Sequence, residues 1–570
     1  MSQESNKKLS REEIAAIEVG VTEIDPKTAW TMIVLFLVII FSVPLLQLIL
    51  DIKNPDQSPQ VFEIKKLLPT SKEISSIKGF ASGSTVNNRI LREINSFEED
   101  LENNSILQKT LLAPAQEFLS GVLKAGNEKA YCGKNGWLFY RPGIDHLTQK
   151  GFLDPKVMKS RAKSGGEWEE TIQPDPVKAI LHFKNQLSKR GIELILMPVP
   201  IKPSVHPEKF SSRFEGKTKI LRNPSFEKFL NLLKRDGVKV FDTASAMEAI
   251  KKSQIAPLYL ETDTHWNSNT MEKIALELSN YIKKLGVNLD KKFQEKLSRK
   301  EVSVSNLGDI ATMLKLSEDQ NIYSNQEIKV KSVSFSDGRP WESDDQSEIL
   351  FLGDSFSNIF SLEGMNWGKA AGFVEQLSYE LNRPVDKLSI NDNGANASRG
   401  LLAQELMRGY DRLKGKKIVI WEFAERELSI GNWKLIEMIL NLKAYEKRKL
   451  NTPKATGNLI IEAVIGEITK APVPGQVPYK DALNSFSLNT IKVVTGDLKD
   501  QEILIYSWVM RENKLMPVAK FKKGQKIKVE LIPWSKVQKK YGAYNRREVD
   551  DPMLMMLEVF WAEKLNLIKE

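Results

Sequence analysis

Three short runs of almost uninterrupted apolar residues constrain the fold of this chain more than any other feature. They are IELILMPV at Ile192 to Val199, EILFLG at Glu348 to Gly353 and KKIVIWEF at Lys416 to Phe423. Apolar side chains on both faces of a strand are typical of a parallel sheet that helices cover on each side. We therefore expect a central sheet whose strands are buried on both faces.

Amphipathic helical segments alternate with these runs. Asp175 and Pro176 provide an N-cap and a first-turn proline, and Gly191 ends that helix directly before the first run. Apolar residues recur at helical spacing at Phe226 to Leu233 and again at Met271 to Ile282. This alternation predicts an α/β fold with a doubly wound parallel sheet.

A separate apolar segment lies near the N-terminus. Thr31 to Leu50 carries no charged residue, and at 1.5 Å per residue it is long enough to cross ~30 Å of hydrocarbon. A cleaved signal peptide fits poorly, because the run is long and no small-residue cleavage site follows it. We expect an uncleaved single-pass anchor. Lysines flank it at both Lys27 and Lys53, so counting charges leaves its topology open.

Changes in composition divide the chain into segments. Beyond Arg448, β-rich runs such as NLIIEAVIGEI and KIKVELIPW are separated by segments containing Pro and Gly, so we expect a second, smaller domain there. Its texture suggests binding of carbohydrate or of a partner protein. The expected order is an N-terminal tail (1–30), a transmembrane anchor (31–50), a linker (51–80), an α/β domain with N-terminal helices (81–447) and a β-rich domain (448–570).

The overall charge limits the classes of partner. The 83 Lys and Arg residues exceed the 73 Asp and Glu residues, which gives a net charge of +10 over 570 residues. This mild excess suits an acidic polymer or an anionic membrane surface. It is far from the concentrated basic stripe of a nucleic-acid binder, so we expect no nucleic acid as partner. A single cysteine, Cys132, excludes an internal disulfide and a cysteine-based zinc cluster.

The end of the second apolar run offers a nucleophile. Functional sites in such sheets gather at the carboxyl ends of the strands. In ILFLGDSFSN the run passes into Gly353, Asp354 and Ser355, so a serine stands where the strand ends. A sharp turn into a helix would expose Ser355 Oγ and leave its backbone N–H available to an oxyanion. A turn without catalytic function is the alternative interpretation.

A second segment, YLETDTHWNSNT at Tyr259 to Thr270, offers a base at another predicted strand end. Asp263 and His265 are two residues apart, so an extended backbone projects both side chains to one side, and Asn267 can cap the following helix. An Asp beside a His fixes the imidazole tautomer, and the other ring nitrogen can then take a proton from a serine hydroxyl. Capping alone is the alternative. Together with the serine, the pair predicts the apparatus of acyl transfer.

Several further residues near these motifs are candidates for contact with an oxyanion or a substrate. The segment NDNGANASRG follows a predicted strand, PIKPSVHP follows the first apolar run, and indole rings can stack on sugar rings. For each of them a structural role is the alternative. The candidates are Gly353, Asn391, Asn393, Gly394, Trp266, Lys202 and His206.

Four ordered motifs resemble the alginate O-acetyltransferase family with its SGNH hydrolase-like domain. They are GKNGWLFYRPGIDHLT, TDTHWN, FLGDSF and IVIWEFAERELS, and the resemblance spans roughly residues 110 to 430. In that family the Asp-x-His motif precedes the Gly-Asp-Ser serine, as it does here. The resemblance implies Ser355 as nucleophile, His265 as general acid and base, and Asp263 as the residue that orients the imidazole. It implies neither an organic cofactor nor a metal.

The resemblance also implies a function and a location. It implies an O-acetyltransferase of the bacterial inner membrane whose periplasmic domain acetylates an exopolysaccharide through an acetyl-serine. Its partners would be the polysaccharide acceptor and a membrane-bound O-acyltransferase that supplies acetyl groups. A polysaccharide acetyl esterase with the same triad and a non-catalytic carbohydrate-binding assembly factor stay open as alternatives. Metal-dependent phosphoesterase chemistry with Asp263, His265 and Asp354 lacks the further ligands that such a centre needs.

Overall fold

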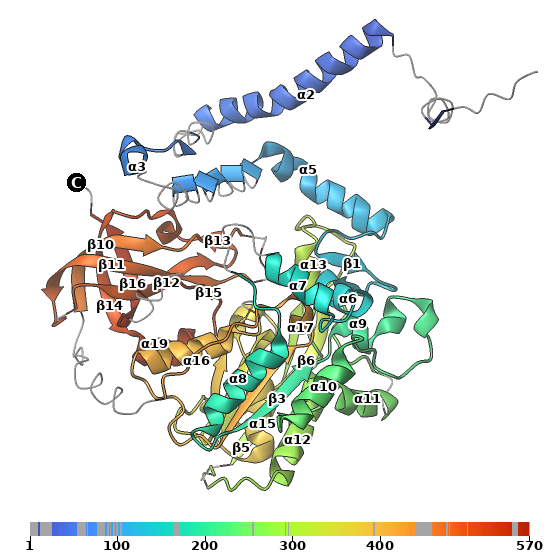
Figure 1. Cartoon of the computed structure of the whole chain (residues 1–570), viewed down its shortest axis with the longest axis vertical. Helices are drawn as coiled ribbons and strands as arrows, with labels where there is room; N and C mark the ends of the chain where they lie inside the picture. The colour runs from blue at the N-terminus through green and yellow to red at the C-terminus, as the bar shows by residue number, and fades with distance from the viewer. Residues whose placement is uncertain are drawn as a thin grey trace, which may run out of the picture. The chain divides into compact units, whose positions relative to one another are not determined.

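The structure of the chain is a computed structural model, drawn in Figure 1. It divides into two compact units, Met1–Leu112 and Ala113–Glu570. Most of the expected N-terminal tail and linker, and the expected domain boundary near residue 448, lie outside the residues that it describes. The described residues are 10–11, 25–53, short pieces of 64–102, 105–164, 171–253, 256–290, 292–293, 296–391, 394–440 and 459–568 without 475–476, 478, 499, 550–553 and 555–556.

The first unit contains the long apolar helix that the sequence predicts. Helix α2 spans Pro26–Lys53 and has no buried residue. Its 28 residues correspond to ~42 Å at 1.5 Å per residue, and it is long and apolar enough to cross a membrane. Helix α3 (Ser71–Ser76) follows, and the chain continues through α5 (Ile106–Glu117) into the π-helical turn η2 (Phe118–Val122).

The core of the second unit is a five-stranded, all-parallel sheet with the strand order β4-β3-β9-β7-β8. The three apolar runs form its three central strands, as predicted, and the edge strands are shorter. The strands are β3 (Glu193–Val199), β4 (Lys239–Val240), β7 (Ile349–Gly353), β8 (Asp386–Ser389) and β9 (Ile418–Ala424).

Helices cover both faces of this sheet (Figure 1). Along β3, Ile195 and Met197 pack in one core while Leu194 and Leu196 pack in the other, because successive side chains of a strand point to opposite faces. The predicted doubly wound α/β fold is confirmed. One face is covered by α8 (Pro176–Ser188), α10 (Phe226–Arg235) and α16 (Ala397–Met407), and the other by α11 (Thr243–Ser253), α12 (Ser268–Lys284) and α15 (Phe373–Leu381).

Shorter elements surround the sheet. The antiparallel strands β5 (Leu297–Asn306) and β6 (Gln326–Phe335) contribute Leu297, Val330 and Val333 to the core shared with α12 and α15. The remaining elements are β1 (Ala130–Cys132), β2 (Leu138–Tyr140), α6 (Arg141–Thr148), α7 (Pro155–Lys163), α9 (Lys202–Val205), η3 (Pro207–Lys209), η4 (Ser212–Phe214), α13 (Asp309–Met313), α14 (Ser355–Asn358), η5 (Glu363–Met365) and α17 (Glu427–Ile430).

The C-terminal part of the second unit is a β-barrel with its own hydrophobic core. Its strands close in the order β10-β11-β12-β16-β14, and β12 and β16 form the one parallel pair of this ring. This is the connectivity of the five-stranded OB fold. The barrel consists of β10 (Leu459–Ile468), β11 (Ala482–Thr495), β12 (Ile503–Arg511), β14 (Lys526–Pro533) and β16 (Val559–Leu567), with β13 (Lys514–Leu515), η6 (Pro517–Lys520), α19 (Trp534–Tyr541) and β15 (Arg546–Arg547) in its connections.

Candidate active site

Ser355 is the first residue of a short helix that begins at the end of β7. Asp354 caps this helix by accepting the N–H of Phe356 at 2.8 Å, and its second carboxylate oxygen accepts the N–H of Ala424 at the end of β9. The turn needs a glycine before it, because a Cβ on Gly353 would lie 2.7 Å from the Phe351 ring. Two neighbouring strands therefore fix the position of the serine.

Asp263 and His265 lie in a tight loop rather than at the end of a sheet strand. A single bridge between Tyr259 and Trp266 closes this loop, so the strand that sequence analysis predicts here is not formed. The side chain of Lys202 holds the loop from inside, because its Nζ donates to the backbone carbonyls of Glu261 at 2.6 Å and Asp263 at 3.0 Å. The predicted cap is confirmed: Asn267 accepts the N–H of Thr270 and begins α12.

The loop and the helix bring three side chains into one hydrogen-bonded line. The Nε2 atom of His265 lies 2.8 Å from Ser355 Oγ, and its Nδ1 atom lies 2.6 Å from Asp263 Oδ1. All three residues are buried, and Ser355 is 6% exposed. This is the spacing at which an imidazole can take a proton from the hydroxyl while the carboxylate fixes its tautomer.

Four N–H groups surround the carboxylate of Asp263. Oδ1 accepts the backbone N–H of His265 as well as Nδ1, and Oδ2 accepts Trp367 Nε1 at 2.8 Å and the backbone N–H of Asp309 at 3.0 Å. Burial alone would raise the pKa of Asp263, but the charge and hydrogen bond of His265 and the other donors hold this pKa at about 2. The group is therefore a carboxylate at neutral pH.

The charge of Asp263 acts in turn on the imidazole. Burial disfavours the imidazolium form of His265, but the neighbouring carboxylates of Asp263 and Asp309 outweigh it. The pKa of His265 is therefore raised above its ordinary value of 6.5, although Arg426 opposes this. A raised pKa favours the protonated imidazole that forms when the serine loses its proton.

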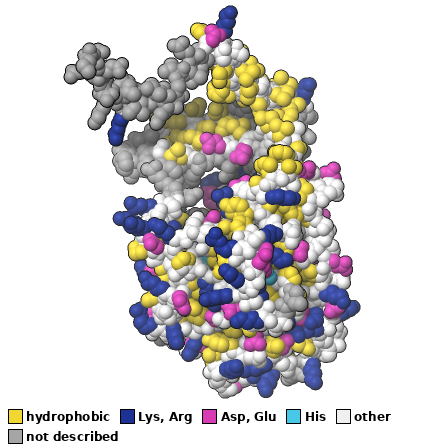
Figure 2. All heavy atoms as spheres, turned by 90° about the vertical axis from the view of Figure 1, so that its right-hand side faces the viewer, with side chains coloured by type: hydrophobic (Ala, Val, Ile, Leu, Met, Phe, Trp, Pro, Cys, Tyr) yellow, Lys and Arg dark blue, Asp and Glu magenta, His cyan; other side chains and the backbone are white. Residues whose placement is uncertain are grey.

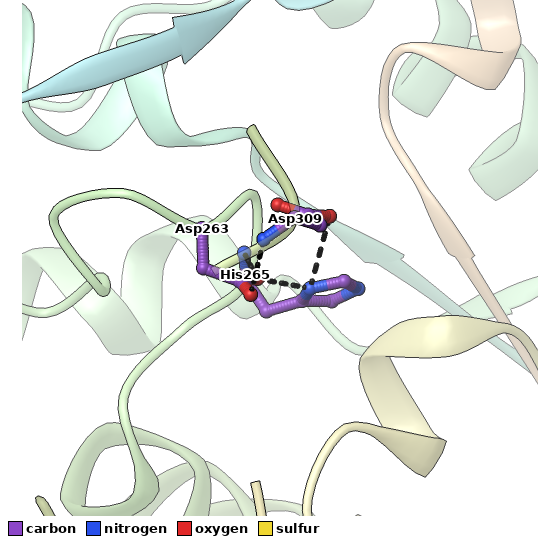
Figure 3. Close-up of side chains that lie close together, drawn as sticks. All are labelled: Asp263, His265 and Asp309. Atoms are coloured by element: carbon purple, nitrogen blue, oxygen red, sulfur yellow. Dashed lines mark hydrogen bonds and ion pairs between the residues drawn. The ribbon is translucent and has the colours of Figure 1, made fainter. Parts of the chain in front are cut away.

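Asp309 is a second carboxyl group beside the ring, and it is half-buried, with 14% of its side chain exposed (Figure 3). Its Oδ2 lies 3.8 Å from His265 Nδ1, and burial together with the charge of Asp263 raises its pKa to about 7.

Asp263, His265 and Asp309 have possible metal-ligand atoms within 4.8 Å of one another. However, both oxygens of Asp263 already accept hydrogen bonds from N–H groups, and the positive hydrogen atoms of these groups would repel a metal cation. Asp354 points its carboxylate at backbone N–H groups instead of joining this cluster.

Ser355 and His265 open into a cavity of about 390 Å³. The parallel-sheet part of the unit supplies one wall of this cavity, including Arg426 and Asn391. Loops of the barrel supply another wall, with Val477, Tyr479 and Lys480 from the β10–β11 connection and Asn513 from the β12–β13 turn. Figure 2 shows basic and acidic side chains interspersed over the face it presents, so the positive charge is not gathered in one stripe there.

The candidate oxyanion residues differ in whether they line the cavity. Asn391 lines the cavity, and its Oδ1 accepts Asn358 Nδ2 at 2.9 Å. Gly353 is enclosed by side chains, and Gly394 lies beside Glu427, so neither lines the cavity. Asn393 lies outside the described residues. As the first residue of its helix, Ser355 has a backbone N–H without an intrahelical acceptor.

The other three substrate candidates lie outside the cavity. Lys202 is 2% exposed beneath the Asp263 loop, where burial lowers its pKa to about 7. His206 accepts the N–H of Leu258 and pairs with Glu208. Trp266 is fully buried. All three residues are buried in the protein interior. Lys202 and His206 bind backbone groups of the segment that carries Asp263 and His265, so these side chains support that segment and do not face the cavity.

Sequence analysis missed several residues that the fold brings to the site. Asp309, Thr264 and the barrel residues Tyr479 and Lys480 are the principal examples. Gly308 caps α13 and Asp309 is its first residue, which is a recognisable helix start, but no local pattern shows that this helix meets the Asp263 loop. The barrel loops carry no motif, and only the tertiary fold places them beside the serine.

Comparisons with known proteins show the family of this chain. A family model described as "SGNH hydrolase-like domain, acetyltransferase AlgX" matches residues 131–425, just over half of the chain. The chain is 21% identical over 309 residues to the probable alginate O-acetylase AlgJ of Pseudomonas aeruginosa, covering 54% of the chain and 72% of that protein. It is 24% identical over 323 residues to the protein of the same name from Pseudomonas syringae pv. tomato, covering 55% and 72%.

Two solved structures also match part of the chain. The O-acetyltransferase domain of Pseudomonas putida AlgJ matches with a TM-score of 0.39 and 19% identity, covering 57% of this chain and 99% of that one. Pseudomonas aeruginosa AlgX matches with a TM-score of 0.36 and 16% identity, covering 59% of this chain and 77% of that one.

Proposed function

Because the chain belongs to the alginate O-acetyltransferase family with an SGNH hydrolase-like domain, we propose that it acetylates an exopolysaccharide through an acetyl-serine at Ser355. It is an O-acetyltransferase of the SGNH type. The observation that carries the proposal is the line from Ser355 Oγ through His265 to Asp263, with distances of 2.8 and 2.6 Å, at the wall of a cavity.

The first half of the reaction forms the acetyl-serine. His265 Nε2 takes the proton of the Ser355 hydroxyl as Oγ attacks the carbonyl carbon of the acetyl donor. The resulting tetrahedral intermediate breaks the bond to the leaving group, which receives the proton from Nε2. In the second half, Nε2 takes a proton from a sugar hydroxyl, whose oxygen attacks the acetyl carbon, and the proton then returns to Ser355 Oγ. Asp263 stabilises the imidazolium in both halves.

Both halves place negative charge on the carbonyl oxygen of the acetyl group. We assign the backbone N–H of Ser355 as its first hydrogen-bond donor, because this N–H stands at a helix start without an intrahelical acceptor. We assign Asn391 Nδ2 as the second donor. Asn391 lines the cavity, and its amide oxygen accepts Asn358 Nδ2 at 2.9 Å. Its amide nitrogen points to Met365 Sδ at 3.3 Å on the same wall, and a thioether is a weak acceptor that a substrate oxygen can replace.

The cavity offers basic side chains to an anionic sugar polymer, beside an equal number of acidic ones. Lys129, Arg426 and Lys480 line it together with Glu128, the buried Asp263 and the half-buried Asp309. The loops between strands 1 and 2 of an OB-type barrel are a common place for oligosaccharides to bind, and here that connection supplies Tyr479 and Lys480. Alginate is the substrate named for the related proteins, and an alginate-like uronic polymer is the acceptor that we propose.

We further propose that α2 anchors the enzyme in the bacterial inner membrane with the second unit in the periplasm. The support is the length and apolar composition of α2. An acyl donor made in the cytoplasm has to cross this membrane, so a membrane-bound O-acyltransferase is the partner that we expect to deliver acetyl groups. The anchor would keep the serine close to that donor.

Acetyl transfer and acetyl-ester hydrolysis use the same triad, and the acceptor distinguishes them. Full-length enzyme in detergent, loaded with a chromogenic acetyl ester, should release its acetyl group faster when uronic-acid oligosaccharides are added, and the oligosaccharide should gain mass. A rate of release that ignores the oligosaccharide, with free acetate as the product, would identify an esterase instead. Ser355→Ala should abolish release in both cases, since it removes the nucleophile.

A further inference from the structure

We propose that Asp309 is a second positioning carboxylate for the His265 imidazole, acting through the hydroxyl group of Thr264. The proposal rests on the function proposed for Ser355 and His265 and names a further residue that this function needs. Asp309 lies 46 residues after Asp263 in the chain, and no sequence motif connects the two. Figure 3 shows its carboxylate beside the imidazole.

The side chain of Asp309 forms its hydrogen bonds with the Asp263 loop and not with its own helix. Its Oδ1 accepts the backbone N–H of Thr264 at 2.7 Å, and its Oδ2 accepts the Thr264 hydroxyl at 2.5 Å. Helix α13 is capped by Gly308, so Asp309 is not its N-cap. A carboxylate that bonds one residue through both oxygens holds that residue in a single rotamer.

Thr264 passes this constraint on to the ring. Its Oγ1 lies 3.1 Å from His265 Nδ1. Because the Thr264 O–H bond points at Asp309, a lone pair of the same oxygen is left to face the Nδ1–H group. The Nδ1–H group then has two acceptors, Asp263 Oδ1 and Thr264 Oγ1, and both favour the tautomer that leaves Nε2 free for the serine.

The start of α13 is clamped against the loop. The N–H groups of Ile310 and Ala311 both donate to the carbonyl of Thr262 at 3.2 Å, and the N–H of Asp309 donates to Asp263 Oδ2. Gly308 has a φ of +94°, and a Cβ there would lie 2.6 Å from the Thr262 carbonyl oxygen. This close approach brings the second carboxylate within 3.8 Å of Nδ1.

The charges around the ring show when Asp309 matters most. His265 faces Asp263 and Asp309 at Nδ1 and Ser355 at Nε2; the charge of Arg426, which also lines the cavity, acts on the ring, and Lys202 lies beneath the loop. With a neutral ring, the two carboxylates repel each other. When the ring becomes an imidazolium, it attracts both of them, so the contribution of Asp309 grows as the proton leaves the serine.

The test uses full-length enzyme and a chromogenic acetyl ester, with kcat and KM measured across pH. Asp309→Asn should lower kcat about tenfold, leave KM unchanged and move the acid limb of the profile to lower pH, because loss of a negative charge lowers the pKa of His265. Thr264→Val should also lower kcat and move the acid limb to lower pH. Thr264→Ser keeps the hydroxyl group and should retain the wild-type kcat and acid limb. Asp337→Asn, on an exposed turn, is the matched control.

A purely structural role gives a different result. In that case Asp309→Asn and Thr264→Val would lower the thermal midpoint and the folded fraction, while the folded enzyme kept the wild-type acid limb, and the proposal would be overturned. If Asp309→Asn does not fold, Thr264→Val against Thr264→Ser still tests the link. Activity that survives in Ser355→Ala would defeat the proposed function itself, whereas an inactive Ser355→Ala beside a wild-type-like Thr264→Val defeats only the role of Asp309.

Discussion

The two walls of the cavity are built in opposite ways. On the parallel-sheet side, Ser355, His265 and Asp263 are buried and hydrogen-bonded to fixed neighbours. On the barrel side, Lys480 is exposed and Tyr479 is half-buried, and both stand in a connection between strands. Proton transfer needs positions fixed to a fraction of an ångström, whereas recognition of a polymer tolerates adaptable loops. We therefore expect chemistry and acceptor recognition to separate by wall.

The largest effect should come from the buried wall. Asp263→Asn keeps the size of the side chain but turns an N–H group toward one of the donors that surround it, and it removes the charge that supports the imidazolium. We expect kcat to fall by about 10⁴-fold, as when the equivalent Asp of a serine protease is replaced, with KM nearly unchanged. Steady-state kinetics on a small acetyl ester checks this. A loss smaller than tenfold would show that the buried wall does not hold the chemistry.

The pH dependence of the wild-type enzyme sharpens the same point. His265 has to be unprotonated to accept the serine proton, and its pKa is raised above 6.5. Activity should therefore rise with pH through a value above 6.5 and fall about tenfold per pH unit below it. A profile of kcat against pH measures this limb. A limb centred below 6.5 would mean that the two carboxylates do not reach the imidazole.

A milder change on the buried wall tests the support of Asp263. Trp367→Phe keeps a large ring but removes the N–H group that donates to Asp263 Oδ2. We expect kcat to fall about tenfold, since a hydrogen bond to a charged group contributes ~1.5–3 kcal/mol. Kinetics should be paired with a thermal melt. An unchanged kcat in a folded variant would show that the remaining donors to the carboxylate suffice.

The smallest effects should come from the barrel wall, and they should appear in KM for the polymer. Lys480→Ala should raise that KM about two- to fivefold and leave turnover of a small ester unchanged, since an exposed ionic contact contributes ~0.5–1 kcal/mol. Lys523→Ala, on another barrel connection outside the cavity, is the matched control. A fall in small-ester turnover in Lys480→Ala would break the separation between the walls.

The sequence predicts the buried wall well because its signals are local. The apolar runs locate β3, β7 and β9 to within one or two residues, and the Gly-Asp-Ser turn follows directly from β7. The sequence also places Asp263 and His265 on one side of their segment. It does not predict that this segment is a loop held by Lys202, because a buried lysine donating to backbone carbonyls leaves no periodic pattern.

The barrel wall and Asp309 could not be predicted for a different reason. Both depend on pairings between distant parts of the chain: β10 with β14, β12 with β16, and the start of α13 with the Asp263 loop. A β-rich texture indicates strands but not the order in which they close. Gly308 is the residue that most directly allows this contact, because a glycine readily adopts the positive φ that brings Asp309 to the loop.

The central claim is that Ser355 carries the acetyl group, and intact-mass measurement tests it most directly. Full-length enzyme mixed briefly with a small acetyl ester and quenched in acid should gain about 42 Da, an acetyl in place of a hydrogen, and peptide mapping should locate the gain at Ser355. The Ser355→Ala enzyme should gain nothing. A gain of the same size in Ser355→Ala, or one that maps to another residue, would contradict the account.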